Sequence, residues 1–217
     1  MATLHKLLVK GRGKSKLLIV GGGERGYFTD IFYNDPNIDV IAFDIYYTNN
    51  LTFIADAHSI PLQNESVDAV IIQAVLEHVL DPALVVSEIY RVLRKDGLVY
   101  AETPFMQPVH EGAYDFTRYT ESGHGYLFKQ FEELSAGASC GAGTNLMWSI
   151  DYFFRSLFRS KAAGKVGKLL FFWLKYFDAL MDKKQIIDAA NGVFFLGRKS
   201  TNSIRAKAII ERYKGAY

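Results

Sequence analysis

The sequence predicts an α/β fold built on a largely parallel sheet, and two observations lead to this prediction. Strand-like and helix-like segments alternate through about the first two thirds of the 217 residues, which is typical of βα units. The aliphatic run Leu17–Val20 suits a strand buried on both faces, and the glycine-rich turn 21–26 lets the backbone approach a ligand closely. Asp44 follows the next predicted strand, 40–43, where its carboxylate can accept hydrogen bonds from ribose hydroxyls. Together these features predict a site for a nucleoside-containing cofactor, without saying which one.

The next elements of the first half follow in order. A helix is predicted over 26–33 and ends at the turn-forming segment 34–37, which has the sequence Asn-Asp-Pro-Asn. A short third strand is predicted over 51–57 and a fourth over 66–73, both rich in β-branched or aromatic residues. These strands continue the βα alternation.

The most clearly marked helix of the chain starts after Asp81. Asp81 suits the N-cap and Pro82 the first helical position, and Gly97 lies just beyond a basic last turn. Its predicted buried stripe consists of Val85, Ile89, Val92 and Leu93.

The second half is less regular. A fifth strand is predicted over 98–102, followed by a long polar and aromatic loop over 103–120. A helix over 125–131, a sixth strand over 133–143 and a last strand over 192–197 complete the list. Residues 146–190, between the last two strands, are helical in character, aromatic and basic, and are interpreted as an insertion or lid within a single domain that spans residues 1–217.

Composition excludes several classes of protein. Lys and Arg total 25 against 23 acids, and the formal net charge of +2 is too small to indicate nucleic-acid binding. Cys140 is the only cysteine, so no intramolecular disulfide and no CxxC metal site is possible, and its expected role is that of a small core residue. No metal site is predicted.

Segments that direct a protein to a membrane are not expected. Residues 1–16 are basic, lack the apolar core of a secretory signal, and are interpreted as a leader to the first strand. The apolar run 169–174 is far shorter than the roughly 20 residues that span a bilayer. The expected location is the cytoplasm, with contact at a membrane surface left open.

From Leu17 to Phe105 the chain resembles the class I S-adenosylmethionine-dependent methyltransferases, especially the type 11 branch. The resemblance rests on motifs whose order and spacing agree over about half of the chain. These motifs are the glycine loop 21–26, the strand-end Asp44, the turn Asp56-Ala57, the segment 66–82 that contains Leu76-Glu-His-Val-Leu-Asp-Pro82, and the segment 88–99 that contains Arg91-Val-Leu-Arg-Lys-Asp-Gly97. The resemblance implies a Rossmann-like seven-stranded methyltransferase sheet with helices on both faces, an antiparallel last strand, and a helical insertion before it.

The resemblance also implies a cofactor, S-adenosylmethionine, and a set of residues that bind it. The glycine loop would pass under the methionine part, Asp44 would hold the ribose, Asp56 and Ala57 would contact adenine, and Gln73 would lie near the transferred methyl. Asp56 alone is equally well explained as a helix N-cap or turn residue. The complete predicted set is Gly21, Gly22, Gly23, Gly26, Asp44, Ile45, Asp56, Ala57 and Gln73.

The chain departs from the family pattern at two positions. The family usually has an acid two residues before the first glycine, and this chain has Ile19. Arg25 stands where a further glycine is common, and it is expected to point to solvent or to reach the cofactor carboxylate.

The loop 103–120 is expected to close over the methyl donor and to carry the acceptor chemistry. His110 is the predicted general base because its unperturbed pKa lies near neutrality, and Asp115 or Glu111 could orient or replace it. The loop also resembles a Pro-Tyr-Asp-Phe-x-Arg-Tyr-Thr segment of type 11 methyltransferases, some linked to glycan or cell-surface pathways, with Ala113 in place of the proline. The predicted catalytic residues of this loop are His110, Tyr114, Asp115 and Arg118. The alternative for Tyr114, Asp115 and Arg118 is a salt bridge and aromatic clamp that fixes the loop to the core. His78 is interpreted as structural, at the start of its helix.

The region 152–177 contains six cations, no acid and many aromatic residues. This composition is typical of helices that lie on an anionic membrane or cover a lipid-linked acceptor. The favoured alternative is a helical cap whose aromatic side chains pack on the sheet.

The predicted function is therefore methyl transfer from S-adenosylmethionine to an oxygen or nitrogen of a small-molecule or glycan-like acceptor. An NAD-dependent reductase is one alternative, although Tyr90 to Arg94 lacks the lysine of a Tyr-x-x-x-Lys pair. A binding module that keeps the fold without the chemistry is the other, because of Ile19.

Overall fold

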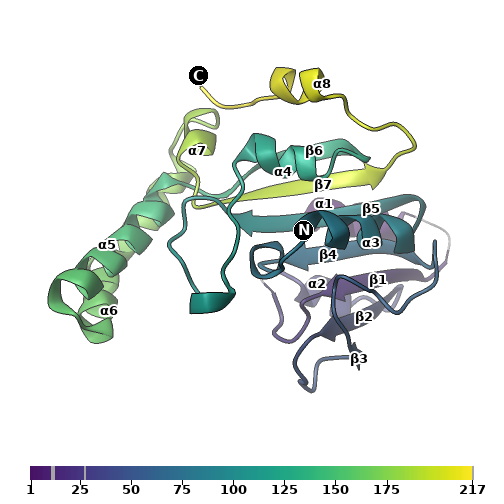
Figure 1. Ribbon diagram of the computed structural model, residues 1–217, viewed down its shortest axis with the longest axis horizontal. Helices are drawn as coiled ribbons and strands as arrows, with labels where there is room; N and C mark the ends of the chain where they lie inside the picture. The colour runs from purple at the N-terminus through teal and green to yellow at the C-terminus, as the bar shows by residue number, and fades with distance from the viewer. Residues whose placement is uncertain (11–12, 27, 217) are drawn as a thin grey trace.

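The core of the protein is one seven-stranded sheet with the strand order β3-β2-β1-β4-β5-β7-β6 (Figure 1). The computed structural model describes residues 1–10, 13–26 and 28–216. Strand β7 runs antiparallel to β5 and to β6, whereas the pairs among β1 to β5 are parallel. The predicted Rossmann-like methyltransferase sheet with an antiparallel last strand is thus confirmed. The strands are β1 (Ser15–Val20), β2 (Ile38–Asp44), β3 (Phe53–Ile54), β4 (Val67–Gln73), β5 (Leu93–Pro104), β6 (Phe131–Cys140) and β7 (Gly192–Lys199).

Helices cover both faces of the sheet because its central strands bury both of their sides. Leu18 and Val20 pack in a hydrophobic cluster with side chains of α3 and α4, while Leu17 and Ile19 pack in a second cluster with side chains of α1 and α2. The helices are α1 (Ala2–Val9), α2 (Asp30–Tyr33), α3 (Pro82–Val92), α4 (Glu121–Leu127), α5 (Ala142–Phe158), α6 (Lys161–Leu170), α7 (Gln185–Asp188) and α8 (Ala206–Glu211), with the 3₁₀ turns η1 (Leu76–His78), η2 (Gly112–Tyr114) and η3 (Phe172–Ala179).

Helix α3 begins as predicted and ends earlier than predicted. The Asp81 carboxylate accepts a hydrogen bond from the Leu84 amide at 3.0 Å, as an N-cap does. The helix ends at Val92 because β5 starts at Leu93 and pairs with β4. Gly97 is needed for a close approach and not for a helix cap, since a Cβ there would lie 2.9 Å from the Arg94 carbonyl oxygen.

Other predicted boundaries need correction. The helix expected over 26–33 is reduced to α2, and its Tyr27 lies outside the described residues. The third strand is limited to Phe53–Ile54 rather than 51–57. Within the segment 1–16, which was interpreted as a leader to the first strand, residues Ala2–Val9 form α1. This helix packs on the sheet through two fully or nearly fully buried leucines, Leu4 and Leu8.

The region after β5 is shifted relative to the predicted elements. Thr120 caps α4 by accepting a hydrogen bond from the Gly123 amide, so this helix starts at Glu121 and not at Gly125. Strand β6 starts at Phe131, the last residue of the predicted helix, rather than at 133. Cys140, expected in the core, is exposed at the end of β6.

The predicted helical elaboration lies between β6 and β7, as expected, but starts at Ala142 rather than 146. Helices α5 and α6 pack against each other and extend away from the sheet (Figure 1). The prediction of a cap whose aromatic side chains pack on the sheet is wrong, since Phe153, Phe158 and Tyr176 are each more than half exposed. That residues 1–217 form a single domain stays a prediction.

Candidate functional site

The predicted cofactor residues come together at the carboxyl ends of β1, β2 and β4. The register places Val20 of β1 beside Phe43 of β2 and Ile72 of β4. The glycine turn, Asp44 and Gln73 follow these three positions directly, so all three meet at one edge of the sheet.

The glycine turn is close-packed against its surroundings. Gly21 has a φ of +74°, and the amides of Gly21 and Gly22 both donate to the Phe43 carbonyl oxygen, at 3.0 and 2.9 Å. A Cβ on Gly22 would lie 2.8 Å from the Ala42 Cβ, and one on Gly21 would lie 2.2 Å from a methyl of Val75. Side chains at these positions would therefore force the turn off the strand ends.

Asp44 binds the turn through its carboxylate. Its Oδ2 accepts from the Gly23 amide at 3.0 Å, and its Oδ1 accepts from the Ile45 amide at 2.7 Å. A Cβ on Gly23 would lie 2.7 Å from Oδ2. A carboxylate has about four lone-pair sites, so Asp44 keeps acceptor capacity for further donors at the edge.

Gln73 and Glu102 form a hydrogen-bonded pair across β4 and β5. Gln73 Nε2 donates to Glu102 Oε2 at 2.5 Å, and the Tyr100 hydroxyl donates to Glu102 Oε1 at 2.7 Å. The Oε1 of Gln73 is buried without a hydrogen-bond partner in the described residues and lies 2.6 Å from where a Cβ of Gly26 would be. Sequence reasoning missed Glu102, although an acid at the end of a strand, in register with Gln73, was the available signal.

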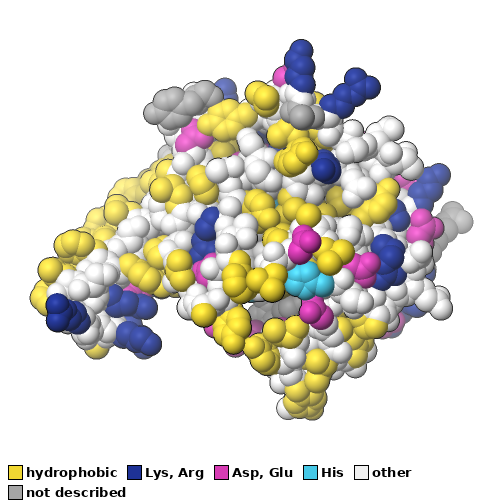
Figure 2. Space-filling view, viewed as in Figure 1, with side chains coloured by type: hydrophobic (Ala, Val, Ile, Leu, Met, Phe, Trp, Pro, Cys, Tyr) yellow, Lys and Arg dark blue, Asp and Glu magenta, His cyan; other side chains and the backbone are white. Residues whose placement is uncertain are grey.

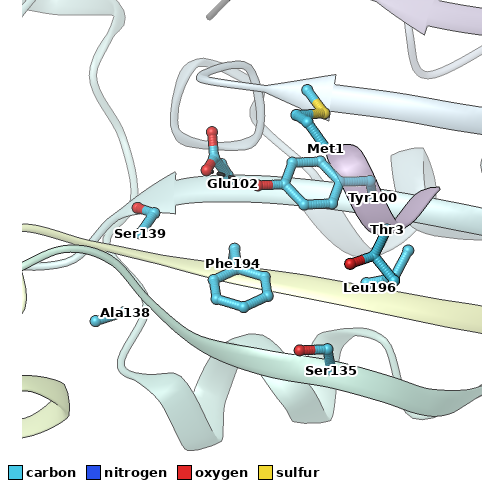
Figure 3. A pocket seen from close by; sticks show the side chains of 9 residues that line it. All are labelled: Met1, Thr3, Tyr100, Glu102, Ser135, Ala138, Ser139, Phe194 and Leu196. Carbon is cyan, nitrogen blue, oxygen red and sulfur yellow. Dashed lines mark hydrogen bonds between the residues drawn. The ribbon is translucent and has the colours of Figure 1, made fainter. Parts of the chain in front are cut away.

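A recess of about 280 Å³ opens beside this pair (Figure 3). Tyr100 and Glu102 line it from β5, together with Phe194 of β7 and Met1 at the start of α1. Burial, the larger cause, and the Glu102 carboxylate both raise the pKa of Tyr100, so its hydroxyl stays a donor. Glu102 therefore both lines the recess and accepts the hydrogen bond from Gln73.

Asp56 is a turn residue in this structure. Its Oδ1 accepts from the His58 amide at 2.8 Å and pairs with the His58 ring at 2.6 Å. These two hydrogen bonds, the amide one first, lower the pKa of Asp56, whose side chain is 65% exposed. Ala57 is buried beside it. An adenine contact at Asp56 and Ala57 stays a prediction.

The two departures from the family pattern have structural explanations. Ile19 is buried in the core on the α1 side of the sheet, where a charged side chain would be costly. The Arg25 guanidinium pairs with Asp30 at 3.2 Å and lies 4.5 Å from the centre of the Tyr33 ring. Arg25 is thus held against α2 in a half-exposed position.

The loop after β5 is fixed by the Asp115 carboxylate. Both Asp115 oxygens accept from the Arg118 guanidinium, and Oδ2 also accepts from the His110 amide at 2.8 Å. The Asp115 side chain is almost fully buried, whereas Tyr114 is exposed. The salt bridge that was the structural alternative for Asp115 and Arg118 is present, and Tyr114 does not clamp the loop with its ring.

His110 meets two residues that follow β4. Its Nε2 lies 3.2 Å from the Nε2 of His78 and 3.7 Å from a carboxylate oxygen of Glu77. The Nδ1 of His78 donates to the Tyr114 carbonyl oxygen at 2.7 Å, and the Glu77 carbonyl oxygen accepts from the Phe116 amide. His78 was predicted to lie at the start of α3, and this position is wrong. The residue lies in η1 and faces His110.

Comparison with known proteins finds a family match over part of the chain. Residues 18–101 match the family of methyltransferase domains called Methyltransf_11. The matched segment is a methyltransferase domain, and the seven-stranded sheet that contains it has the fold of class I S-adenosylmethionine-dependent methyltransferases. A search of curated proteins finds no match.

Solved structures share the fold of this methyltransferase at low sequence identity. A putative methyltransferase from Bacillus halodurans C-125 aligns with a TM-score of 0.58 at 18% identity, covering 92% of this chain and 98% of that one. A putative sarcosine dimethylglycine methyltransferase from Galdieria sulphuraria aligns with a TM-score of 0.57 at 15% identity, covering 92% and 82%. Coclaurine N-methyltransferase bound to N-methylheliamine and SAH aligns with a TM-score of 0.55 at 14% identity, covering 91% and 70%.

The edge of the sheet fits the cofactor of the methyltransferase. The glycine turn leaves no room for side chains, Asp44 retains acceptor capacity, and the buried Gln73 Oε1 has no hydrogen-bond partner in the described residues. An unpartnered buried amide oxygen is costly unless a ligand donor meets it. We therefore expect the turn, Asp44 and Gln73 to hold S-adenosylmethionine.

The histidine cluster of the methyltransferase surrounds a fully buried acid. The Glu77 side chain has no exposed surface and neither oxygen has a hydrogen-bond partner in the described residues, so burial raises its pKa to about 7. Burial also lowers the pKa of His110, and the neighbouring His78 lowers it further. One atom from each of Glu77, His78 and His110 lies within 4.8 Å of the others, a spacing that a metal ion could also use. At neutral pH, His110 is a neutral imidazole that can accept a proton.

Proposed function

We propose that this methyltransferase transfers a methyl group to an oxygen or nitrogen of a small-molecule or glycan-like acceptor, and that a hydroxyl fits best. The observation that carries this proposal is the cluster of Glu77, His78 and His110, directly after β4. A hydroxyl must lose its proton as it attacks, whereas a neutral amine attacks with its lone pair. A proton acceptor such as His110, with the buried Glu77 beside it, therefore assists methylation of a hydroxyl more than methylation of an amine.

Bound S-adenosylmethionine supplies a methyl group on a positively charged sulfur, which a nucleophile attacks in line. The residues at the strand ends would align this methyl group with the attacking atom of the acceptor. Gln73 ends β4 only four residues before Glu77, so the methyl donor and the histidine cluster are attached to the same short segment. This proximity supports a reaction between the sheet edge and the loop.

In this proposal His110 accepts the proton of the acceptor. Its lowered pKa keeps it neutral near pH 7. The positive charge that it gains is stabilised by Glu77 at 3.7 Å and by Asp115, whose Oδ2 lies 3.3 Å from His110 Nδ1. Arg118 acts through Asp115 and is a positioning residue.

The surface around the cluster supports a small or glycan-like acceptor. Tyr114 and Phe116 are exposed on the loop, and their rings offer flat apolar faces next to polar groups. Sugar rings combine apolar faces with hydroxyls, so both parts of such an acceptor would find a partner.

The test is methyl transfer from labelled S-adenosylmethionine to a panel of sugars, polyols, phenols and amines, with product analysis of the methylated atom. We expect O-methylated products. We also expect kcat/KM to rise with pH as one proton is lost from His110 and to reach its plateau at a pH below the ordinary histidine pKa of about 6.5. Methylation of amines alone, with no acid limb, would contradict the assignment of His110.

A further inference from the structure

The helical elaboration forms an arm that consists of α5, α6 and η3. Its helices extend beyond the edge of the sheet and pack mainly on one another (Figure 1). Gly164 and Gly167 of α6 allow this packing, because a Cβ on Gly164 would lie 2.2 Å from an Asp151 oxygen and one on Gly167 would lie 2.5 Å from the Phe154 ring. The arm is thus a close-packed unit with its own internal contacts.

The acids of the arm are used inside it. Asp151 is buried and pairs with Arg155 at 2.9 Å. Asp178 accepts from the Gly143 amide at 2.7 Å and from the Thr144 hydroxyl at 2.6 Å, at the start of α5. Neither carboxylate is therefore available to balance cations on the outer surface.

Cations gather on the outer surface of the arm. Figure 2 shows Lys and Arg side chains at its far end, next to hydrophobic side chains. Arg159, Lys161 and Lys165, where α5 ends and α6 begins, are exposed, and none of them makes an ion pair within the described part of the chain. Lys175 of η3 is also exposed, but it lies near the start of α5. The far end of the arm carries a local positive charge that the small net charge of the chain conceals.

Large apolar side chains are exposed on the same arm. Leu169 is 70% exposed and Phe153 is 62% exposed, values unusual for such residues on a helix that covers a core. The other exposed large apolar residues of the arm are Leu146, Leu157, Phe158, Val166, Leu170, Phe172, Trp173, Tyr176 and Phe177. Within the described residues, no helix has the length and apolar content needed to cross a bilayer.

We propose that the arm docks on the surface of an anionic lipid bilayer. Exposed leucine and phenylalanine side chains would enter the boundary between headgroups and acyl chains, while the lysines would meet anionic headgroups. Trp173 and Tyr176 add amphipathic rings, which favour the membrane interface. A second copy of the chain explains the apolar residues but not the uncompensated cations, which would repel their equivalents.

The arm also contacts the loop that carries His110. The Tyr152 hydroxyl donates to the Val109 carbonyl oxygen, and Asn145 Nδ2 lies 3.7 Å from the Met106 sulfur. Docking of the arm would therefore bring the acceptor loop close to the bilayer. The proposal does not depend on which atom the enzyme methylates.

The test is sedimentation of the full chain with vesicles of phosphatidylglycerol and phosphatidylcholine in equal parts, compared with vesicles of phosphatidylcholine alone. The decisive variant combines Arg159→Glu, Lys161→Glu and Lys165→Glu. Each basic residue near an anionic surface contributes about 1 kcal/mol, or about a fivefold change in partitioning, so three reversals should weaken binding at least about 100-fold. The matched control reverses three exposed lysines elsewhere, Lys6, Lys10 and Lys95, and should bind like the wild type.

A second pair of variants tests the apolar contact. Leu169→Ser with Leu170→Ser should weaken binding to the mixed vesicles at least about tenfold, because each lost apolar side chain contributes roughly 1.5–3 kcal/mol when buried. Leu80→Ser with Leu84→Ser removes two exposed leucines outside the arm and should change nothing. Circular dichroism melts confirm that every variant is folded.

Two outcomes would overturn the proposal. One is equal binding to mixed and pure phosphatidylcholine vesicles. The other is a dimer by light scattering that the Leu169→Ser and Leu170→Ser pair dissociates, with no vesicle binding by the wild type.

Discussion

The cofactor edge and the arm are built on opposite principles. At the edge, each functional residue ends a strand or lies in a turn that the sheet itself positions, as for Asp44 and Gln73. In the arm, α5 and α6 are held by internal contacts such as the Asp151–Arg155 pair, and their outer surfaces face solvent. The edge therefore depends on the global fold, whereas the arm depends on local packing and can vary without changing the sheet.

The difference gives the two regions separate energetics. A change in the arm should leave cofactor affinity unaltered, and a change at the edge should leave the arm folded. Each of the following predictions tests this independence or a role within one region.

The largest effect is expected for His110→Ala. Loss of a general base typically costs about 10²–10⁴-fold in turnover, because the acceptor must then lose its proton to water. Affinity for S-adenosylhomocysteine should stay the same, as measured by calorimetry beside steady-state kinetics. The control is His5→Ala, a histidine of α1 that pairs with Asp35. If His110→Ala lost affinity for S-adenosylhomocysteine but kept its turnover at saturating substrate, the catalytic role assigned to the loop would be contradicted.

Asp44→Ala should weaken S-adenosylhomocysteine binding about 100-fold or more. Each hydrogen bond to a carboxylate is worth about 1.5–3 kcal/mol. The variant would lose the predicted hydrogen bonds from the ribose hydroxyls and the hydrogen bond from the Gly23 amide. Asp39→Ala, at the other end of the same strand, serves as the control in the same calorimetric titration. Equal affinities for the two variants would contradict the assignment of Asp44.

Gly164→Ala should loosen the arm by about 1–3 kcal/mol, because its methyl group has no space against Asp151. Faster amide exchange in α5 and α6 would report this change, while the cofactor affinity stays at the wild-type value. Ser156→Ala, on the exposed face of α5, is the control. A parallel loss of cofactor affinity would show that the arm and the edge are coupled.

Acid should destabilise the sheet region through His124. Burial, and secondarily Arg212, lowers the pKa of this histidine to about 3 in the folded state. The unfolded state binds a proton near pH 6.5 that the folded state cannot bind, so stability is lost as the pH falls from about 6.5 toward 3. Between pH 7.5 and 5 the free energy of unfolding should fall by about 2 kcal/mol on this account. Denaturant melts at both pH values should show a smaller fall for His124→Gln, and an equal fall would exclude His124 as the cause.

Sequence reasoning located the edge well because local and global signals agree there. The aliphatic run before Gly21 must be a buried strand, and residues that end neighbouring parallel strands meet at one edge of the sheet. The positions of Asp44 and Gln73 at the strand ends were therefore predicted correctly. The segments 66–82 and 88–99 then indicated the resemblance to methyltransferases rather than to NAD-dependent enzymes.

Contacts between distant segments were less accessible to sequence reasoning. His78 was placed at the start of a helix because nothing local shows that the loop 105–120 returns to η1. Glu102 was missed since its importance comes from its partner on the neighbouring strand, and the composition of 152–177 indicated helices without indicating that they leave the sheet.

The central claim is that the strand edge binds the methyl donor, and isothermal calorimetry with the wild-type chain tests it most directly. The chain should bind S-adenosylhomocysteine and should show no comparable heat with NAD. Tight binding of NAD without binding of S-adenosylhomocysteine would contradict the account.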